Sequence, residues 1–283
     1  MVISGRTDLA GEAHRLWQRE ADQTSSLPGV KAREEQIKGF PLTSIEILDE
    51  EGAQVLQKPP GRYYCFHLPA SPRRGSECFV PAVELLAELI RRCLPSRAES
   101  ILIAALGNPD VTPDALGSLS AGHILITRHL IGDPLFARLH STALSRTGVL
   151  GTTGMESALQ IRALCQTLKP DCLIAIDALA GVEVEELCRS VQVCDAGIAP
   201  GSGVGNDREA LDVSNLGIPV IAIGVPTVID ALSLGGDAAL GSFFVTPRYI
   251  DSAVRDLARL IAYGVNLALH PGLSFDEMEM LVE

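Results

Sequence analysis

The chain has 283 residues, of which 47% are hydrophobic, and its formal net charge is -12. This length suits one large α/β domain or two small ones with a sizeable core. The acidic balance argues against a nucleic-acid binder held by phosphate contacts. The N-terminus lacks the apolar region of a signal peptide, and no stretch of about twenty apolar residues is present to span a membrane. Seven cysteines without a C-x-x-C pair indicate reduced, buried thiols in a cytoplasmic protein.

The N-terminal part of the sequence predicts one helix and two strands. The helix runs from residue 9 to about residue 21. Residues 23–38 mix charges around a Pro-Gly pair and are predicted to be a mobile connector. Alternating apolar and polar residues predict strands at 43–48 and 62–68, with a turn at 50–52 between them. These two strands are expected to form an antiparallel edge.

Strands and helices alternate over the rest of the chain. Helices are predicted at residues 82–93, 155–168, 183–188 and 248–269, and strands at 100–106, 123–128, 172–176, 191–198 and 218–223. Residues 129–150 carry few strong signals. The alternation predicts an α/β fold with one mostly parallel central sheet and helices on both faces.

The triplet Asp-Ala-Leu follows three of these apolar strands, and it begins at Asp114, Asp177 and Asp230. Asp is a poor strand residue, so Asp177 is expected where its strand ends, at the carboxyl edge of the sheet. Open α/β proteins place their clefts at this edge. If the three strands are neighbours, the three carboxylates converge there. The alternative is that each Asp caps the helix that follows it.

Two carboxylates close together in a partly desolvated cleft cannot both ionise easily, so one keeps its proton. Such a pair supplies a general acid and a general base for the attack of water on an amide. Asp114 and Asp177 are the better candidates, because glycines flank both loops, whereas Asp230 is given an auxiliary or capping role.

Other hydrolytic chemistries find little support in the sequence. The histidines form no H-E-x-x-H motif, and no G-x-S-x-G nucleophile motif occurs. Ser202 and Cys194 remain as minor candidates for a nucleophile. The loop 199–206 contains alternating glycines that match no phosphate-binding fingerprint, and it is predicted to make a tight turn that lines a pocket.

Several blocks of sequence, in order along the chain, carry a resemblance to a known family. They include RTDLA at 6–10, VTPDALG at 111–117, TRHL at 127–130, IAIDALA at 174–180, PGSGVGN at 200–206, LGIPVIAIGVPTV at 216–228 and NLALH at 266–270. The sequence resembles the germination protease family, spore endopeptidases that degrade small acid-soluble spore proteins. The match runs from near the first residue to about residue 270.

The resemblance implies an α/β three-layer sandwich similar to the hydrogenase-maturation endopeptidases. It implies an atypical aspartic peptidase in the spore core, with essential carboxylates at Asp114 and Asp177 and no metal or other cofactor. Self-cleavage of the Asp8–Leu9 bond is implied, so residues 1–8 would be a short pro-segment and residues 9–283 a single peptidase domain. The implied partners are small acid-soluble spore proteins as substrate and further copies of the chain, since tetramers are typical. Auxiliary or pocket positions are expected at Asn108, Gly201, Ser202, Gly203, Asn206 and Asp230.

The sequence departs from the family pattern at two places. Only residues 232–244 separate two blocks between which the family usually carries a long insertion, and residues 181–183 replace a small residue, Arg and Ser with Gly, Val and Glu. Two alternatives therefore stay open. One is a metal-assisted peptidase of the hydrogenase-maturation type, and the other is a degenerate homologue that binds spore proteins without cutting them.

Overall fold

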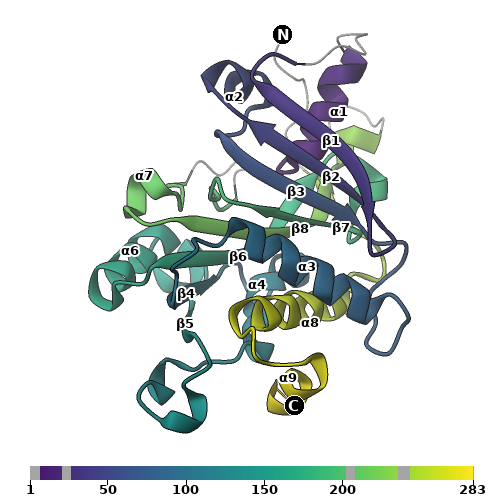
Figure 1. Ribbon diagram of the computed structural model, residues 1–283. Coiled ribbons are helices and arrows are strands. Elements are labelled where there is room, and N and C mark those ends of the chain that lie inside the picture. Colours follow the sequence, from purple (N-terminus) through teal and green to yellow (C-terminus); the bar gives the residue numbers. More distant parts are fainter. Residues whose placement is uncertain (1–6, 21–26, 202–207, 235–242, 283) are drawn as a thin grey trace.

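The computed structural model describes residues 7–20, 27–201, 208–234 and 243–282, and within them a nine-stranded mixed sheet lies between helices (Figure 1). The strand order is β1-β2-β3-β7-β8-β6-β4-β5, and β9 pairs with β8. The strands are β1 (Val30–Ile37), β2 (Phe40–Ile47), β3 (Gly61–His67), β4 (Ser100–Ala105), β5 (Ser141–Arg146), β6 (Cys172–Gly181), β7 (Ser190–Cys194), β8 (Val220–Asp230) and β9 (Phe244–Val245). The α/β fold predicted from the sequence is confirmed.

The strands β8, β6, β4 and β5 run parallel and form the centre of the fold. Their registers place Ile103, Ile174 and Ile221 in one row across three strands. All three side chains are buried, as expected for strands that helices cover on both faces. The three strands that precede the Asp-Ala-Leu triplets are therefore neighbours, as predicted.

The other half of the sheet is antiparallel, and the sequence predicted it only in part. Residues 30–37 are not a mobile connector, because they form β1 and pair along their whole length with β2. Most residues of β1 are exposed and half of them are charged, as expected for an edge strand, where charges discourage pairing with other chains. Residues 50–56 do not turn but form a helix, because Asp49 caps it by accepting a hydrogen bond from the Gly52 nitrogen at 3.0 Å.

Three further local predictions were wrong. Residues 123–128 form no strand and pass instead between two short 3-10 turns, at Ala121–His123 and Arg128–Leu130. The strand β5 lies in the stretch that carried few signals, because its small and polar residues need only pair with β4 at the sheet edge. The helix expected at 183–188 is only the 3-10 turn Val184–Glu186.

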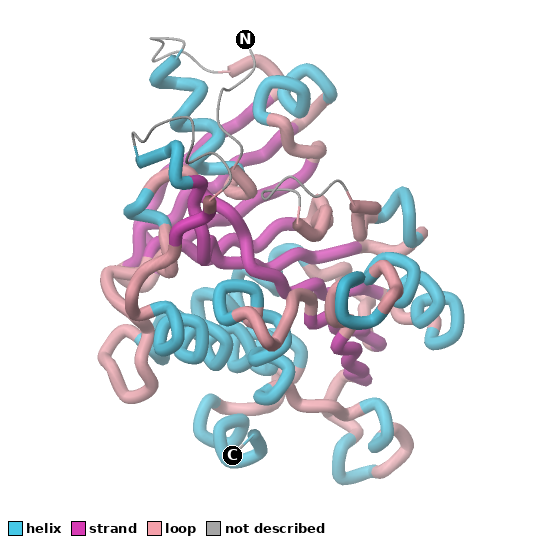
Figure 2. The backbone as a smooth tube through the Cα atoms, turned by 180° about the vertical axis from the view of Figure 1, so that it is seen from behind, coloured by secondary structure: helices cyan, strands magenta, loops and turns pink. Residues whose placement is uncertain are grey.

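Helices cover both faces of the sheet, as the two opposite views show (Figures 1 and 2). They are α1 (Ala10–Glu20), α2 (Glu50–Leu56), α3 (Phe79–Cys93), α4 (Leu116–Ser120), α5 (Leu150–Thr153), α6 (Ser157–Leu168), α7 (Val213–Leu216), α8 (Ile250–Leu269) and α9 (Phe275–Val282). The main core lies on the face covered by α3 and α8. On the opposite face, α1 and α2 pack on the antiparallel half, and α6 packs on the parallel half. None of the described helices is both long enough and apolar enough to pass through a membrane.

Candidate active site

Asp177 lies inside β6 and not at its end, contrary to the sequence-based expectation. The strand continues to Gly181 because β8 continues beside it and pairs with it, from Asp177 opposite Gly224 to Gly181 opposite Ile229. This long-range pairing outweighs the poor strand propensity of a single Asp. The residues after Asp177 are therefore strand, not the start of a turn or helix.

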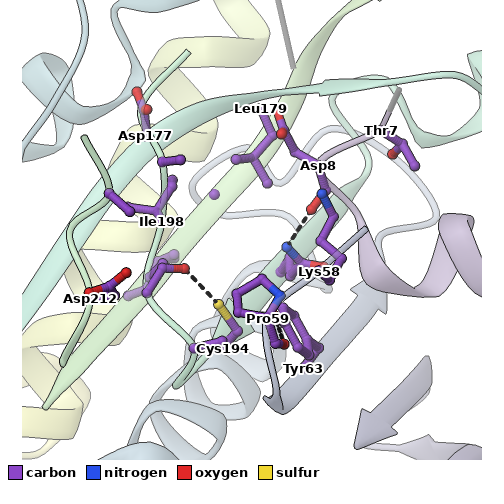
Figure 3. Close-up of a pocket in the computed structure, with 18 of the residues that line it drawn as sticks. Thr7, Asp8, Lys58, Pro59, Tyr63, Asp177, Leu179, Cys194, Ile198 and Asp212 are labelled. Atoms are coloured by element: carbon purple, nitrogen blue, oxygen red, sulfur yellow. Dashed lines mark hydrogen bonds between the residues drawn. The ribbon is translucent and has the colours of Figure 1, made fainter. Parts of the chain in front are cut away.

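The side chain of Asp177 points to the face of the sheet that α6 covers only in part. Side chains alternate along a strand, so Asp177 and Leu179 share a face with Leu173 and Ala175. The latter two are buried beneath α6, whereas Asp177 and Leu179 line two adjoining cavities of about 430 and 360 Å³. Figure 3 shows Asp177 at the edge of the larger cavity. We call the two cavities together the cleft.

Asp114 ends the 3-10 turn Thr112–Asp114, which follows β4, and it lines the smaller cavity together with Asp177. The backbone nitrogen of Asn108 donates a hydrogen bond to its Oδ2 at 2.8 Å. Gly107 has a φ of +91°, and a Cβ there would lie 2.0 Å from the carbonyl oxygen of Asp114. The glycine and the Asn108 backbone thus fix the carboxylate, and the structure brings the two predicted catalytic residues to one cavity.

The two carboxyl groups interact electrostatically. Burial raises the pKa of Asp177 well above its ordinary value, and the negative charge of Asp114 raises it further. A hydrogen bond of 2.9 Å from the Ala178 nitrogen opposes both effects only in part. Burial also raises the pKa of Asp114, while the Asn108 nitrogen and the charge of Arg208 lower it. Because Asp177 is 4% exposed and Asp114 is half-buried, burial disfavours the charged form more strongly at Asp177.

Asp230 is not brought to this pair. It ends β8, six residues beyond Gly224, which at about 3.3 Å per strand residue places it roughly 20 Å further along the sheet. Its Oδ1 accepts a hydrogen bond of 2.9 Å from the Leu232 nitrogen, so it caps the turn that follows. Among the described residues that line the cleft, Asp230 is not found.

The N-terminal segment enters the cleft and brings Asp8 to both cavities. The Asp8 nitrogen donates to the carbonyl oxygen of Ala180 at 2.9 Å, and the Ala180 nitrogen donates to Asp8 Oδ2 at 2.8 Å. Leu9 is fully buried. Figure 3 shows Lys58 extending toward Asp8, and although burial lowers the pKa of Lys58, the charge of Asp8 opposes that effect. The implied self-cleavage bond, Asp8–Leu9, is thus held against the extension of β6.

The family of this chain is decided by its sequence matches. A family model for germination protease matches residues 10–241, which is most of the chain. This chain belongs to the germination protease family. The resemblance found in the sequence is therefore confirmed. Membership of this family makes the chain an endopeptidase, a hydrolase of peptide bonds, with a protease role in spores.

Relatives named germination protease match the chain over its full length. The one from Caldanaerobacter subterraneus subsp. tengcongensis is 34% identical over 330 residues, covering 100% of this chain and 99% of the relative. The one from Bacillus mycoides is 36% identical and covers 99% of this chain and 76% of the relative. Among solved structures, the chain is similar to a [NiFe] hydrogenase maturation protease HycI from Thermococcus kodakarensis KOD1, at 20% identity and a TM-score of 0.38, covering 64% of this chain and 98% of that one.

The remaining predicted positions of this germination protease family member divide into two groups. Gly201 lines both cavities and has a φ of +76°, a conformation that glycine adopts without strain. Ser202, Gly203 and Asn206 lie outside the described residues.

Burial raises the pKa of Cys194 to about 11, so its thiol is a poor nucleophile. Across the described part of the chain, no three His, Cys, Asp or Glu side chains are grouped to hold a metal ion.

The cleft residues that the sequence analysis did not name include Lys58, Gln192 and Arg208. Each reaches the cleft from a separate part of the chain, so local sequence gives no sign of their common location. Arg208 did follow the glycine-rich loop that was predicted to line a pocket, and this was the one available signal.

Proposed function

We propose that the protein is an aspartic endopeptidase of the spore core that hydrolyses small acid-soluble spore proteins. The observation that supports it is the single cavity shared by Asp114 and Asp177, in which the charge of Asp114 helps to keep Asp177 protonated. The cavity walls include apolar side chains of Val111, Val149 and Phe244. Such walls suit an apolar side chain next to the bond that is cut.

In this mechanism the ionised Asp114 is the general base. It removes a proton from the attacking water, whose oxygen bonds to the carbonyl carbon of the peptide. The protonated Asp177 donates its proton to the leaving nitrogen as the C–N bond breaks. The two roles follow from the different burial of the two groups, because the more buried acid is the one that stays neutral.

Self-processing belongs to the same proposal. Asp8, the acidic residue before the implied cut, lines the cleft, and Leu9, the apolar residue after the cut, is buried next to it. Residues 1–8 would then be the pro-segment, and the bound segment would resemble a substrate whose cleavage leaves residues 9–283 as the peptidase.

A gel assay tests the proposal. The purified full chain is incubated with a basic, unstructured small acid-soluble spore protein, and mass spectrometry reads both the fragments and the N-terminus of the enzyme. We expect cuts after acidic residues and loss of residues 1–8. An intact substrate that nevertheless binds would favour the non-cleaving alternative. Loss of cleavage on chelation, with recovery on adding divalent metal, would favour the metal-assisted one. Light scattering on the same sample tests the proposed homo-oligomer.

Arg208 provides a prediction on pH dependence. Burial raises the pKa of Asp114 and Asp177, and the charge of Arg208 opposes this at both groups. Arg208→Gln should therefore raise both pKa values, so both limbs of the bell-shaped profile of kcat/KM move to higher pH. Arg162→Gln is the matched control, because Arg162 pairs with Glu209 and does not line the cleft. A profile that stays in place or moves to lower pH would contradict this arrangement of charges.

A further inference from the structure

Gln192 contacts the backbone of the N-terminal segment on both sides of the Asp8–Leu9 bond. Its Nε2 donates a hydrogen bond of 3.0 Å to the carbonyl oxygen of Asp8. Its Oε1 accepts one of 2.8 Å from the backbone nitrogen of Ala10. The carbonyl of Asp8 belongs to the peptide bond whose cleavage is proposed above, and Ala10 is the second residue after it. A single buried amide thus spans the bond.

The sheet registers place this amide on the same face of the sheet as Asp177. Gly224 of β8 is the partner of Asp177 on β6 and also the partner of Gln192 on β7. Residues in one row across a sheet point to the same face, and neighbouring strands lie about 4.8 Å apart. The side chains of Asp177 and Gln192 therefore rise from the same face, two strands apart. Between them Gly224 contributes no side chain, and all three residues line the larger cavity.

The contacts of Gln192 involve only backbone atoms of the bound segment. These are a carbonyl oxygen and the N–H two residues later, groups that a peptide offers whatever its side chains, and here they flank Leu9 between the bend at Asp8 and the start of α1. Ala180 supports the segment from the other side, because its carbonyl oxygen accepts from the Asp8 nitrogen at 2.9 Å. On the β6 side the Asp8 side chain contributes as well, since its Oδ2 accepts from the Ala180 nitrogen, whereas the contacts of Gln192 do not depend on the side chains of the segment.

We infer that Gln192 is a substrate-binding residue that holds a peptide across the bond to be cut, by donating to the carbonyl oxygen before the cut and accepting from the second N–H after it. This rests on the proposed function, and it deepens that proposal by assigning a residue to backbone recognition. As water adds to the carbonyl carbon, negative charge develops on the oxygen that Nε2 contacts, so the hydrogen bond strengthens in the transition state.

The competing explanation is that Gln192 only anchors the protein's own N-terminus. The nitrogen of Ala10 is the first of helix α1 and would otherwise lack a partner within the helix. The two explanations predict opposite results for a peptide added in trans. If Gln192 is only an anchor, its replacement frees the cleft and added peptides bind more tightly. If it binds substrate, its replacement weakens them.

A double-mutant cycle between protein and peptide tests the inference without requiring cleavage. The full chain carries Asp177→Asn to prevent cleavage and Asp8→Ala to loosen its own N-terminal segment by removing the Oδ2 contact with Ala180. It binds a fluorescent peptide that contains Thr-Asp-Leu-Ala, and anisotropy gives its Kd. A second peptide has lactic acid in place of the Ala, so an ester oxygen replaces the N–H that Oε1 accepts. Each peptide is measured with and without Gln192→Ala. Gln160→Ala is the control, because the Gln160 amide also donates to two backbone carbonyls but does not line the cleft.

We expect the ester and Gln192→Ala each to raise the Kd about tenfold. In the Gln192→Ala protein, the ester should raise the Kd little further. Gln160→Ala should leave both Kd values unchanged. An equal ester penalty with and without Gln192, tighter binding in Gln192→Ala, or no binding of either peptide overturns the inference. Cleavage of the first peptide by the wild type is measured separately. If the wild type does not cleave this peptide, the result counts against the proposed peptidase. If it does cleave the peptide but the ester and Gln192→Ala weaken binding independently, the result counts against this inference alone.

Discussion

Asp177→Asn is expected to lower kcat/KM for peptide cleavage by about 10²- to 10⁴-fold, the range of a lost general acid. The amide of Asn has the shape of the protonated acid and can still accept from the Ala178 nitrogen, but it cannot give up a proton to the leaving group. Asp114→Asn should cause a comparable loss, since an amide cannot take the proton of the water. The gel assay with spore protein measures both variants against the wild type.

The same Asp177 variant should be more stable than the wild type at neutral pH. The folded pKa of Asp177 is raised well above the unfolded value, chiefly by burial. Between the two values the folded state holds a proton that the unfolded state has lost, so stability falls as pH rises through this window. Asn removes the ionisable group and with it this loss of stability. We expect Tm to rise by about 2–4 °C for each kcal/mol gained in the free energy of unfolding.

Thermal unfolding from pH 4 to pH 8 checks this, with Asp114→Asn as the control. Asp114 is half-buried, so its replacement should change the pH dependence of Tm less. Full activity in both single variants would rule out the paired-acid mechanism. An Asp177→Asn protein whose Tm drops at pH 8 would show instead that the folded structure depends on the ionised group.

The sequence was sufficient to predict Asp114 and Asp177 as a pair, because a buried apolar strand followed by Asp is a local pattern. Neighbouring parallel strands then bring the loops after them together. Sequence could not predict that β6 continues beyond Asp177. That depends on the pairing of its last residues with β8, which lies more than forty positions later. The same dependence on long-range pairing explains Asp230. Its strand is one of the predicted neighbours, but its carboxylate lies too far along that strand to reach Asp114 and Asp177.

Two features that the sequence analysis missed, the strand β1 and the contacts of Gln192, have a common physical origin. β1 is a strand because its backbone pairs with β2, although its exposed side chains show no apolar alternation. Gln192 contacts a segment more than 180 residues earlier in the chain, and nothing in the residues around it distinguishes it from any other strand glutamine. In both cases the structure depends on hydrogen bonds to backbone groups of another segment, the next strand for β1 and a distant segment for Gln192, and such bonds leave no apolar periodicity in the sequence.

Gly117→Ala should destabilise the protein strongly and reduce cleavage. Gly117 lies in α4, just after Asp114, and its backbone conformation is one that alanine also adopts. A Cβ there would lie 2.5 Å from the carbonyl oxygens of both Ile176 and Leu106. These are backbone atoms in the middle of β6 and just past the end of β4, and the Ile176 oxygen already accepts a hydrogen bond of 2.9 Å from the Leu106 nitrogen. Neither oxygen can move aside as a flexible side chain would.

The added methyl must therefore push α4 away from the strands, at a cost of about 1–3 kcal/mol or more. The same shift would move Asp114, which is held by the Gly107 loop, relative to Asp177, which is fixed in β6. Urea unfolding and the cleavage assay should thus both show a loss. Gly122→Ala is the matched control, because a Cβ at Gly122, in the next turn of the chain, meets nothing within 4 Å. Wild-type stability in Gly117→Ala would mean that α4 can move freely, and the close approach of Gly117 would then not fix the distance between the two acids.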